Sequence, residues 1–126
     1  MRQLVKAGVA PFRNAQLHKQ GDICLLCLQP LSKADAVLDH CHKSGECRGI
    51  LHRGCNALLG KIENARPQNG LVDDVKFATF LSNVAGYIQN AKMSVLHPSH
   101  KTEEQKRLLK NKRARRARVV KKKETL

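Results

Sequence analysis

The sequence of 126 residues has few aromatic residues, few acidic residues and no long apolar run. Three Phe, one Tyr and no Trp provide little large apolar surface for a core, and a chain this short buries a modest share of its surface in any case. A further stabilising element such as a bound metal is therefore expected. No segment approaches the ~18 apolar residues of a membrane span, and the first residues lack the apolar stretch of a signal peptide. We therefore expect a cytoplasmic protein that does not engage membranes.

The charge of the chain is strongly positive and unevenly spread. Lys and Arg number 24 against 10 acidic residues, so the formal net charge is +14. This excess favours a polyanionic partner, and nucleic acid is the leading candidate. Residues 97–126 hold 12 of the basic residues and 3 acidic ones. We interpret residues 1–96 as one domain and residues 97–126 as a basic C-terminal arm, with a linker around Pro98.

Local patterns predict a short helix followed by a β-hairpin. The helix is expected over residues 12–20 and ends at Gly21. Apolar runs at residues 36–38 and 49–51 have strand character, and residues 43–46 form a segment rich in turn-forming residues between them. The two runs therefore predict the strands of one hairpin.

Two further helices are expected after the hairpin. The first would begin at Asn56 as its N-cap and stop before Pro67. The second would cover residues 71–89, and its broad apolar face needs a partner. Together with the hairpin, these helices predict an α+β fold.

The five cysteines follow a metal-binding pattern. Their number is odd and they lie between residues 24 and 55, interspersed with three histidines, which favours a metal site over a set of disulfides. Cys24 and Cys27 form one pair with x2 spacing, and His52 and Cys55 form a second pair with the same spacing. Two such knuckles supply the four ligands of a structural Zn²⁺ site, which leaves no open position for chemistry.

Two alternatives stay open at this site. Cys41 or Cys47 could replace His52 as the fourth ligand, although the matched spacing with Cys55 favours His52. Cys24 and Cys27 could instead be a redox pair, but such a pair is expected at a strand–helix junction of a larger α/β pattern.

A second group of polar residues lies inside the zinc-binding stretch. Phosphodiester cleavage needs a base to activate water and a hard cation held by oxygen ligands. Asp39 and Asn56 supply oxygens, and His40 can act as the base. Strict strand alternation would place Asp39 and His40 on opposite faces, so both can serve one phosphate only where the strand bends. The alternative is that both are solvated hairpin residues and that Asn56 is only a helix cap.

The stretch from residue 24 to residue 60 resembles the phage recombination endonuclease VII family, part of the wider His-Me finger (HNH, ββα-metal) nucleases. The resemblance is carried by Cys24-x2-Cys27, Leu38-Asp39-His40-Cys41-His42, Gly45-Glu46-Cys47-Arg48-Gly49-Ile50-Leu51-His52-x2-Cys55-Asn56 and Leu59-Gly60. It implies a small zinc-braced ββα-metal finger, here with flanking helices and the basic C-terminal arm.

The resemblance also implies roles for individual residues. Asp39 matches a ligand of the catalytic Mg²⁺ or Mn²⁺, His40 the general base and Asn56 the second metal ligand. His42 matches a second active-site histidine, and Arg48 lies where a DNA contact is expected.

Three positions depart from the family pattern. His52 replaces the usual cysteine, which keeps a competent zinc ligand. Cys41 stands where an acidic residue is common, and Leu59 stands where some members carry a glutamate. Both of these changes remove a carboxylate from the neighbourhood of the catalytic metal.

The arm is expected to contact DNA phosphates. Thr102 and Gln105 fit a capping box, so a helix can start there. Basic residues lie all round this helix, so it is predicted to be disordered alone or helical on DNA. The expected phosphate-binding residues are Lys106, Arg107, Lys110, Arg113 and Arg116.

The sequence thus predicts a Mg-dependent DNA endonuclease, with double-stranded or branched DNA as its substrate. Resolution of a DNA junction would require two active sites and hence a homodimer. Two other functions remain alternatives: a phage homing or nicking endonuclease of the HNH type, and a non-catalytic zinc module that only binds nucleic acid. If the chain is of phage origin, its location would be the host cytoplasm.

Overall fold

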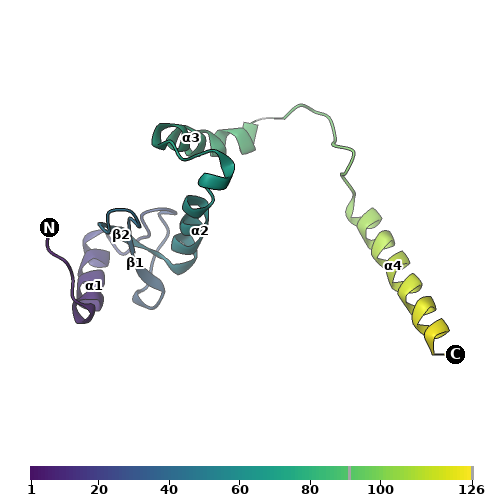
Figure 1. Cartoon of the computed structure of the whole chain (residues 1–126), viewed down its shortest axis with the longest axis horizontal. Helices are drawn as coiled ribbons and strands as arrows, with labels where there is room; N and C mark the ends of the chain where they lie inside the picture. The colour runs from purple at the N-terminus through teal and green to yellow at the C-terminus, as the bar shows by residue number, and fades with distance from the viewer. Residues whose placement is uncertain (91, 126) are drawn as a thin grey trace. The chain divides into compact units, whose positions relative to one another are not determined.

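The computed structural model describes residues 1–90 and 92–125. The described residues form two strands and four α-helices, which Figure 1 labels. The predicted α+β class is thus confirmed. The chain divides into two units, Met1–Ser82 and Asn83–Leu126, each of which is described by itself. The elements are β1 (Ala36–His40), β2 (Cys47–His52), α1 (Val9–Lys19), α2 (Arg53–Asn64), α3 (Asp74–Asn90) and α4 (Glu103–Glu124).

The predicted β-hairpin is confirmed, with strands longer than the apolar runs suggested. β1 and β2 pair antiparallel, with Ala36 opposite His52 and Asp39 opposite Gly49. Beyond Asp39 the register shifts, so that His40 pairs with Cys47. The connecting turn places Gly45 at a φ of 77°, a left-handed conformation that glycine adopts without strain.

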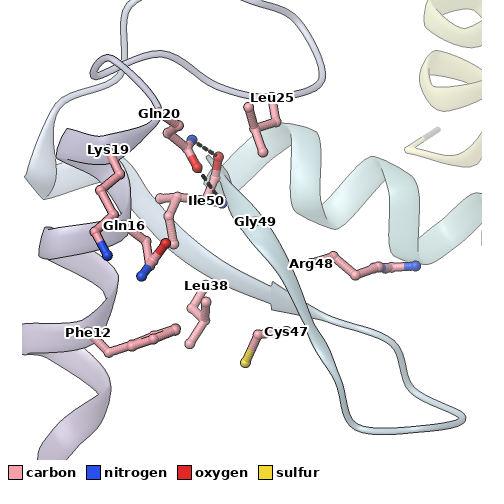
Figure 2. A pocket seen from close by; sticks show the side chains of 10 residues that line it. All are labelled: Phe12, Gln16, Lys19, Gln20, Leu25, Leu38, Cys47, Arg48, Gly49 and Ile50. Atoms are coloured by element: carbon pink, nitrogen blue, oxygen red, sulfur yellow. Dashed lines mark hydrogen bonds between the residues drawn. The ribbon is translucent and has the colours of Figure 1, made fainter.

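Helix α1 is tied to the outer edge of β2 by one amide side chain. Gln20 donates from Nε2 to the carbonyl oxygen of Ile50 at 2.7 Å and accepts from the Ile50 backbone N–H at 3.2 Å. Figure 2 draws both bonds. The helix starts at Val9, three residues before the predicted start, because Pro11 lies in the first turn where its missing N–H costs nothing.

The core of this unit is small and includes cysteines that were predicted to bind zinc. Six buried side chains form it, and Leu38, Cys55 and Leu59 pack against it in part. Among the described residues no aromatic side chain belongs to this cluster. The six are Leu17, Cys24, Leu31, Ala36, Ile50 and Leu51.

Helix α2 corrects one sequence-based prediction. The helix begins at Arg53, with His52 in the N-cap position, so the prediction of Asn56 as the N-cap was wrong. The second knuckle explains the early start, because ligands three residues apart approach each other when the segment between them is a helical turn. Asn56 therefore lies within the first turns of α2. The helix ends at Asn64, before Pro67, as predicted.

Helix α3 starts at Asp74, three residues later than predicted, because Arg66 holds the preceding segment in another conformation. Its guanidinium donates to the carbonyl oxygens of Leu71 and Val72, each at 2.9 Å, and to Asp74 at 2.7 Å. No side chain of α3 is buried. The apolar face predicted to need a partner is thus mostly exposed, with Val84 half-buried.

The arm contains the predicted capping box. Gln105 donates its backbone N–H to Thr102 Oγ1 at 3.2 Å, and Thr102 donates its own to Gln105 Oε1 at 2.9 Å. One helix, α4, follows, and none of its residues is buried. Residues 92–102 form neither helix nor strand. In the part of the chain that the structure describes, no helix is long and apolar enough to cross a membrane.

Replacing Gln20 by Ala is expected to lower the free energy of unfolding of the domain by about 1–3 kcal/mol. The substitution leaves the backbone groups of Ile50 without their partner, and unmet buried polar groups cost about that much. Urea unfolding of the full chain measures the loss. The control is Gln3→Ala, because Gln3 is exposed. Equal free energies of unfolding for the two variants would contradict the proposed link between Gln20 and β2.

Candidate metal centre and active site

The four predicted zinc ligands gather at one place. The ligand atoms of Cys24, Cys27, His52 and Cys55 all lie within 4.8 Å of one another. In a tetrahedral zinc site, ligand atoms at roughly 2.0–2.3 Å from the ion are about 3.3–3.8 Å apart. Cys27 Sγ and His52 Nδ1 are already 3.3 Å apart, and Cys55 Sγ is 4.0 Å from the same nitrogen. The cluster could therefore hold a zinc ion after a small contraction.

The ring of His52 is set in the tautomer that a metal requires. Its Nε2 lies 2.9 Å from the carbonyl oxygen of Pro30. A carbonyl can only accept, so Nε2 carries a proton, and Nδ1 is the nitrogen that can offer its lone pair to an ion. Such a partner on the other ring nitrogen is a regular feature of metal-bound histidine. The substitution of cysteine by His52 thus retains a complete ligand set.

Two thiols of the cluster have pKa values shifted in opposite directions, and a bound cation would favour the ionised form of each. Burial, followed by hydrogen bonds from Cys27 and Cys24, raises the pKa of the Cys55 thiol to about 11. Burial also opposes ionisation of Cys24, but backbone hydrogen bonds from Cys27, His52 and Leu26 outweigh it and lower its pKa to about 6. One ligand is therefore poised as a thiolate while another resists ionisation. A bound Zn²⁺ would favour deprotonation of both.

The first knuckle packs directly on the hairpin. A Cβ atom at Gly49 would lie 2.6 Å from Leu25 Cδ1, so the end of the Leu25 side chain lies directly against the strand at this glycine. Within the described residues, Cys41 and Cys47 are not part of the metal cluster. The structure therefore favours His52 over both cysteines as the fourth ligand.

A charged network lies on the α2 side of the hairpin. Asp39 is 6% exposed. Its Oδ2 accepts from Arg48 Nε at 2.7 Å and its Oδ1 accepts from Nη2 at 3.1 Å. Arg48 also donates from Nη1 and Nη2 to the two oxygens of Glu63, at 3.1 and 2.9 Å. Hydrogen bonds to Glu63 and Asp39 raise the pKa of Arg48, which therefore stays charged.

The shift in strand register places Arg48 in this network. Asp39 pairs with Gly49 and His40 with Cys47, which leaves Arg48 as the extra residue of a β-bulge. Figure 2 shows Arg48 extending toward α2 from the rim of a cavity of about 320 Å³ between α1 and the hairpin. Leu38 and Cys47, which belong to the hairpin, line the same cavity together with residues of α1. The bulge lies on β2, whereas on β1 Asp39 contacts Arg48 and His40 lines a groove with Phe12 of α1. The structure therefore does not show the bend between Asp39 and His40 that the sequence analysis required.

The two candidate active-site histidines lie close together. The ring centroids of His40 and His42 are 5.1 Å apart. His40 is exposed and lines an open groove of about 720 Å³ together with Phe12, Leu38 and Arg2. Within residues 1–90 and 92–125, the His40 ring makes no hydrogen bond. Its nitrogen atoms are thus available to water or substrate.

Asn56 is half-buried in α2. Its side chain makes no hydrogen bond to any described residue, so its amide oxygen is free to accept a ligand. The structure thus joins Asp39 to Arg48 and His40 to His42, whereas Asn56 contacts neither pair by a hydrogen bond. The arm residues Lys106, Arg107, Lys110, Arg113 and Arg116 all lie on α4, in the other unit.

Glu63 is a residue of the charged network that the sequence did not predict. Its carboxylate contacts Arg48, and this interaction lowers the pKa of Glu63, which is therefore ionised at neutral pH. The available signal was its position seven residues after Asn56, which places both on one face of a helix. No local motif marks it, because its partner lies on β2.

The family model of recombination endonuclease VII matches residues 2–90 of the chain. The matched range takes in α1, both strands, α2, α3 and all four residues of the metal cluster. No curated protein sequence matches the chain.

Proposed function

Since the chain belongs to the recombination endonuclease VII family, we propose that it is a metal-dependent DNA endonuclease of the His-Me finger type. Family membership implies a DNA endonuclease. The proposal adds a mechanism in which His40 is the general base and one Mg²⁺ or Mn²⁺ assists. The family match over residues 2–90 is the observation that carries it, because it includes the hairpin with Asp39 and His40 and the helix with Asn56.

His40 is suited to accept a proton from water. Its ring is exposed at the edge of the groove, and histidine is the side chain that most often serves as a general base near neutral pH. Neutral His40 takes the proton of the water that attacks phosphorus. His42, whose ring centroid is 5.1 Å from that of His40, is proposed to contact the phosphate. The products would carry a 5′-phosphate and a 3′-hydroxyl.

Asp39 and Asn56 are the proposed ligands of the catalytic cation. A carboxylate and an amide oxygen are donors that a hard cation prefers, and Mg²⁺ commonly takes one or two protein ligands alongside water and phosphate oxygens. Asn56 supports this fit, because it has no competing hydrogen bond from a described residue. Both Asp39 oxygens accept hydrogen bonds from Arg48, which the ion would have to replace. A bound ion would neutralise the phosphate and stabilise the leaving 3′ oxygen.

The Cys24, Cys27, His52 and Cys55 cluster is proposed as a structural zinc site. Four protein ligands complete a tetrahedron and leave no position for a substrate. The ion would fix the first knuckle, the end of β2 and the start of α2 to one point. It thereby supports the elements that carry Asp39 and Asn56.

The substrate is proposed to be double-stranded DNA, with branched DNA as the preferred form. A net charge of +14 favours a polyanion, and the word recombination in the family's name points to DNA junctions. Arg48 and the basic residues of α4 are the proposed phosphate contacts. The cytoplasm stays the predicted location, since DNA is accessible there.

A homodimer is proposed because a junction presents two strands to be cut. The exposed apolar residues of α3, among them Val75 at 75%, Phe80 at 49% and Ile88 at 70% exposure, are a candidate contact surface. Light scattering after size-exclusion chromatography should give a mass near twice 14.1 kDa. A single-chain mass at concentrations that cut DNA would refute the dimer.

The test of the function is cleavage of supercoiled plasmid by the purified full chain. We expect nicked and linear forms with Mg²⁺ and none after EDTA, because the ion acts on the phosphate. A synthetic four-way junction beside a linear duplex of the same sequence then tests the preference for branched DNA. A protein that binds DNA but cuts none of these forms with Mg²⁺ or Mn²⁺ would be a non-catalytic binding module.

Neutralising the arm is expected to weaken DNA binding without abolishing cleavage. Replacement of five basic residues by Gln should flatten the slope of log K against log salt by up to about 4.5, since each phosphate contact is worth about 0.9. The five are Lys106, Arg107, Lys110, Arg113 and Arg116. Fluorescence anisotropy over a salt series measures the slope.

Two controls belong to the arm experiment. Cleavage at saturating protein should persist, because Asp39, His40 and Asn56 lie outside the arm. Duplexes of different sequence should lose affinity alike, because phosphate contacts carry no base information. An unchanged salt slope would exclude the arm from DNA binding.

A further inference from the structure

The Asp39 carboxylate is fully engaged by a cation that the chain itself supplies. Both of its oxygens accept hydrogen bonds from Arg48, at 2.7 and 3.1 Å, in a bidentate arrangement. Asp39 is 6% exposed, so little water competes for it. Bidentate pairs of this kind are among the strongest interactions of a carboxylate.

A second carboxylate fixes the guanidinium from the other side. Glu63, on α2, accepts from Arg48 Nη1 and Nη2 at 3.1 and 2.9 Å. Arg48 Nη2 donates to both carboxylates, so the guanidinium lies between β1 and α2. Two carboxylates from different elements around one positive group also describe how proteins bind a metal ion.

We propose that Arg48 is a positioning residue that takes the place of the catalytic cation in the DNA-free protein, so that Arg48 and the divalent ion compete for Asp39. The inference rests on the proposed function. When Arg48 releases Asp39, its hydrogen bonds to Glu63 keep the guanidinium beside the proposed metal site. The N–H groups of Arg48 Nε and Nη2 that had bonded Asp39 then become free to contact a DNA phosphate, while Nη1 and the other N–H of Nη2 stay on Glu63.

Electrostatics requires this competition. A guanidinium and a divalent ion on one buried carboxylate repel each other, and the low exposure of Asp39 limits screening. A phosphate relieves the repulsion, because the planar fork of Arg binds phosphate as well as it binds carboxylate. DNA and the divalent ion should therefore each raise the affinity of the protein for the other.

Binding of Mn²⁺ to the zinc-loaded full chain without DNA tests the proposal. Electron paramagnetic resonance reports free Mn²⁺ in a titration and needs no catalysis. Arg48→Gln should bind Mn²⁺ at least about fivefold more tightly than the wild type, in the range of typical coupling between sites. A residue with a purely structural role would give the opposite result, since its loss would loosen Asp39 and weaken metal binding.

The matched control is Arg53→Gln. Arg53 is exposed at the start of α2, and the same charge is removed without touching Asp39. We expect its Mn²⁺ affinity to equal that of the wild type. Zinc content and circular dichroism establish that each variant is folded. Equal gains in both variants would assign the effect to net charge and overturn the proposal.

The coupling to DNA gives a second readout. In a His40→Ala background, which is expected to bind DNA without cutting it, a duplex should raise the Mn²⁺ affinity. With Arg48→Gln added, that increase should shrink by the factor that Arg48→Gln gained without DNA. An increase of the same size with and without Arg48 would overturn the proposal.

Asp39→Asn separates failure of this inference from failure of the proposed function. If Asp39→Asn leaves Mn²⁺ binding unchanged in every background, Asp39 is no metal ligand and the proposed mechanism fails. If Asp39→Asn abolishes Mn²⁺ binding while Arg48→Gln leaves the affinity unchanged or lower, the mechanism stands and the competition with Arg48 is wrong.

Discussion

Replacing His40 by Ala is expected to reduce the rate of DNA cleavage by about 10²- to 10⁴-fold, the usual contribution of a general base. DNA affinity should stay close to the wild-type value, because His40 acts on water after the phosphate is bound. Binding and cleavage should therefore separate in this variant. Single-turnover cleavage of a labelled substrate and anisotropy without Mg²⁺ measure the two properties.

His100→Ala is the matched control for this experiment. His100 is exposed in the segment between α3 and α4, far along the sequence from the hairpin. Its replacement should leave the rate unchanged. A His40→Ala protein that cuts at the wild-type rate would require another base, and His42 would be the first candidate because its ring lies 5.1 Å from that of His40.

Removal of zinc is expected to unfold the domain. Structural zinc in small domains contributes about 10–16 kcal/mol of apparent binding free energy at pH 7, which is larger than the stability of a typical domain. The core here consists of six buried side chains, and one of them is the proposed ligand Cys24. Cys24→Ser should therefore abolish both zinc binding and cooperative thermal unfolding.

Cys47→Ser is the control for the zinc prediction, because Cys47 is exposed and lies outside the metal cluster of the described residues. It should retain about one zinc per chain and the wild-type unfolding curve. Elemental analysis and circular dichroism provide the two measurements. A folded wild-type protein that contains no zinc and keeps its structure in a strong chelator would contradict this part of the account.

Short-range patterns predicted the parts of the fold that local chemistry controls. The x2 spacing in each knuckle predicted the four ligands that gather in the structure. The glycine-containing turn predicted the hairpin, and Thr102 with Gln105 predicted the capping box of α4. In each case the interacting residues are close in the sequence or share a rigid ligand geometry.

Features that depend on tertiary contacts were not predictable in the same way. The start of α2 at Arg53 follows from the knuckle geometry, which overrides the cap preference of Asn56. The late start of α3 follows from hydrogen bonds made by Arg66. The bulge at Arg48 and its contact with Glu63 need the paired strands and α2 in place, so no sequence window contains the signal.

The chemistry of the DNA ends tests the central claim most directly. The full chain is incubated with supercoiled plasmid and Mg²⁺ until nicked circles form, and DNA ligase is then added without any end-repair enzyme. Water activated by a general base cleaves the bond to the 3′ oxygen, so the nicks should carry a 5′-phosphate and a 3′-hydroxyl and the ligase should reseal them. Absence of nicks with either Mg²⁺ or Mn²⁺, or nicks that the ligase cannot close, would contradict the account.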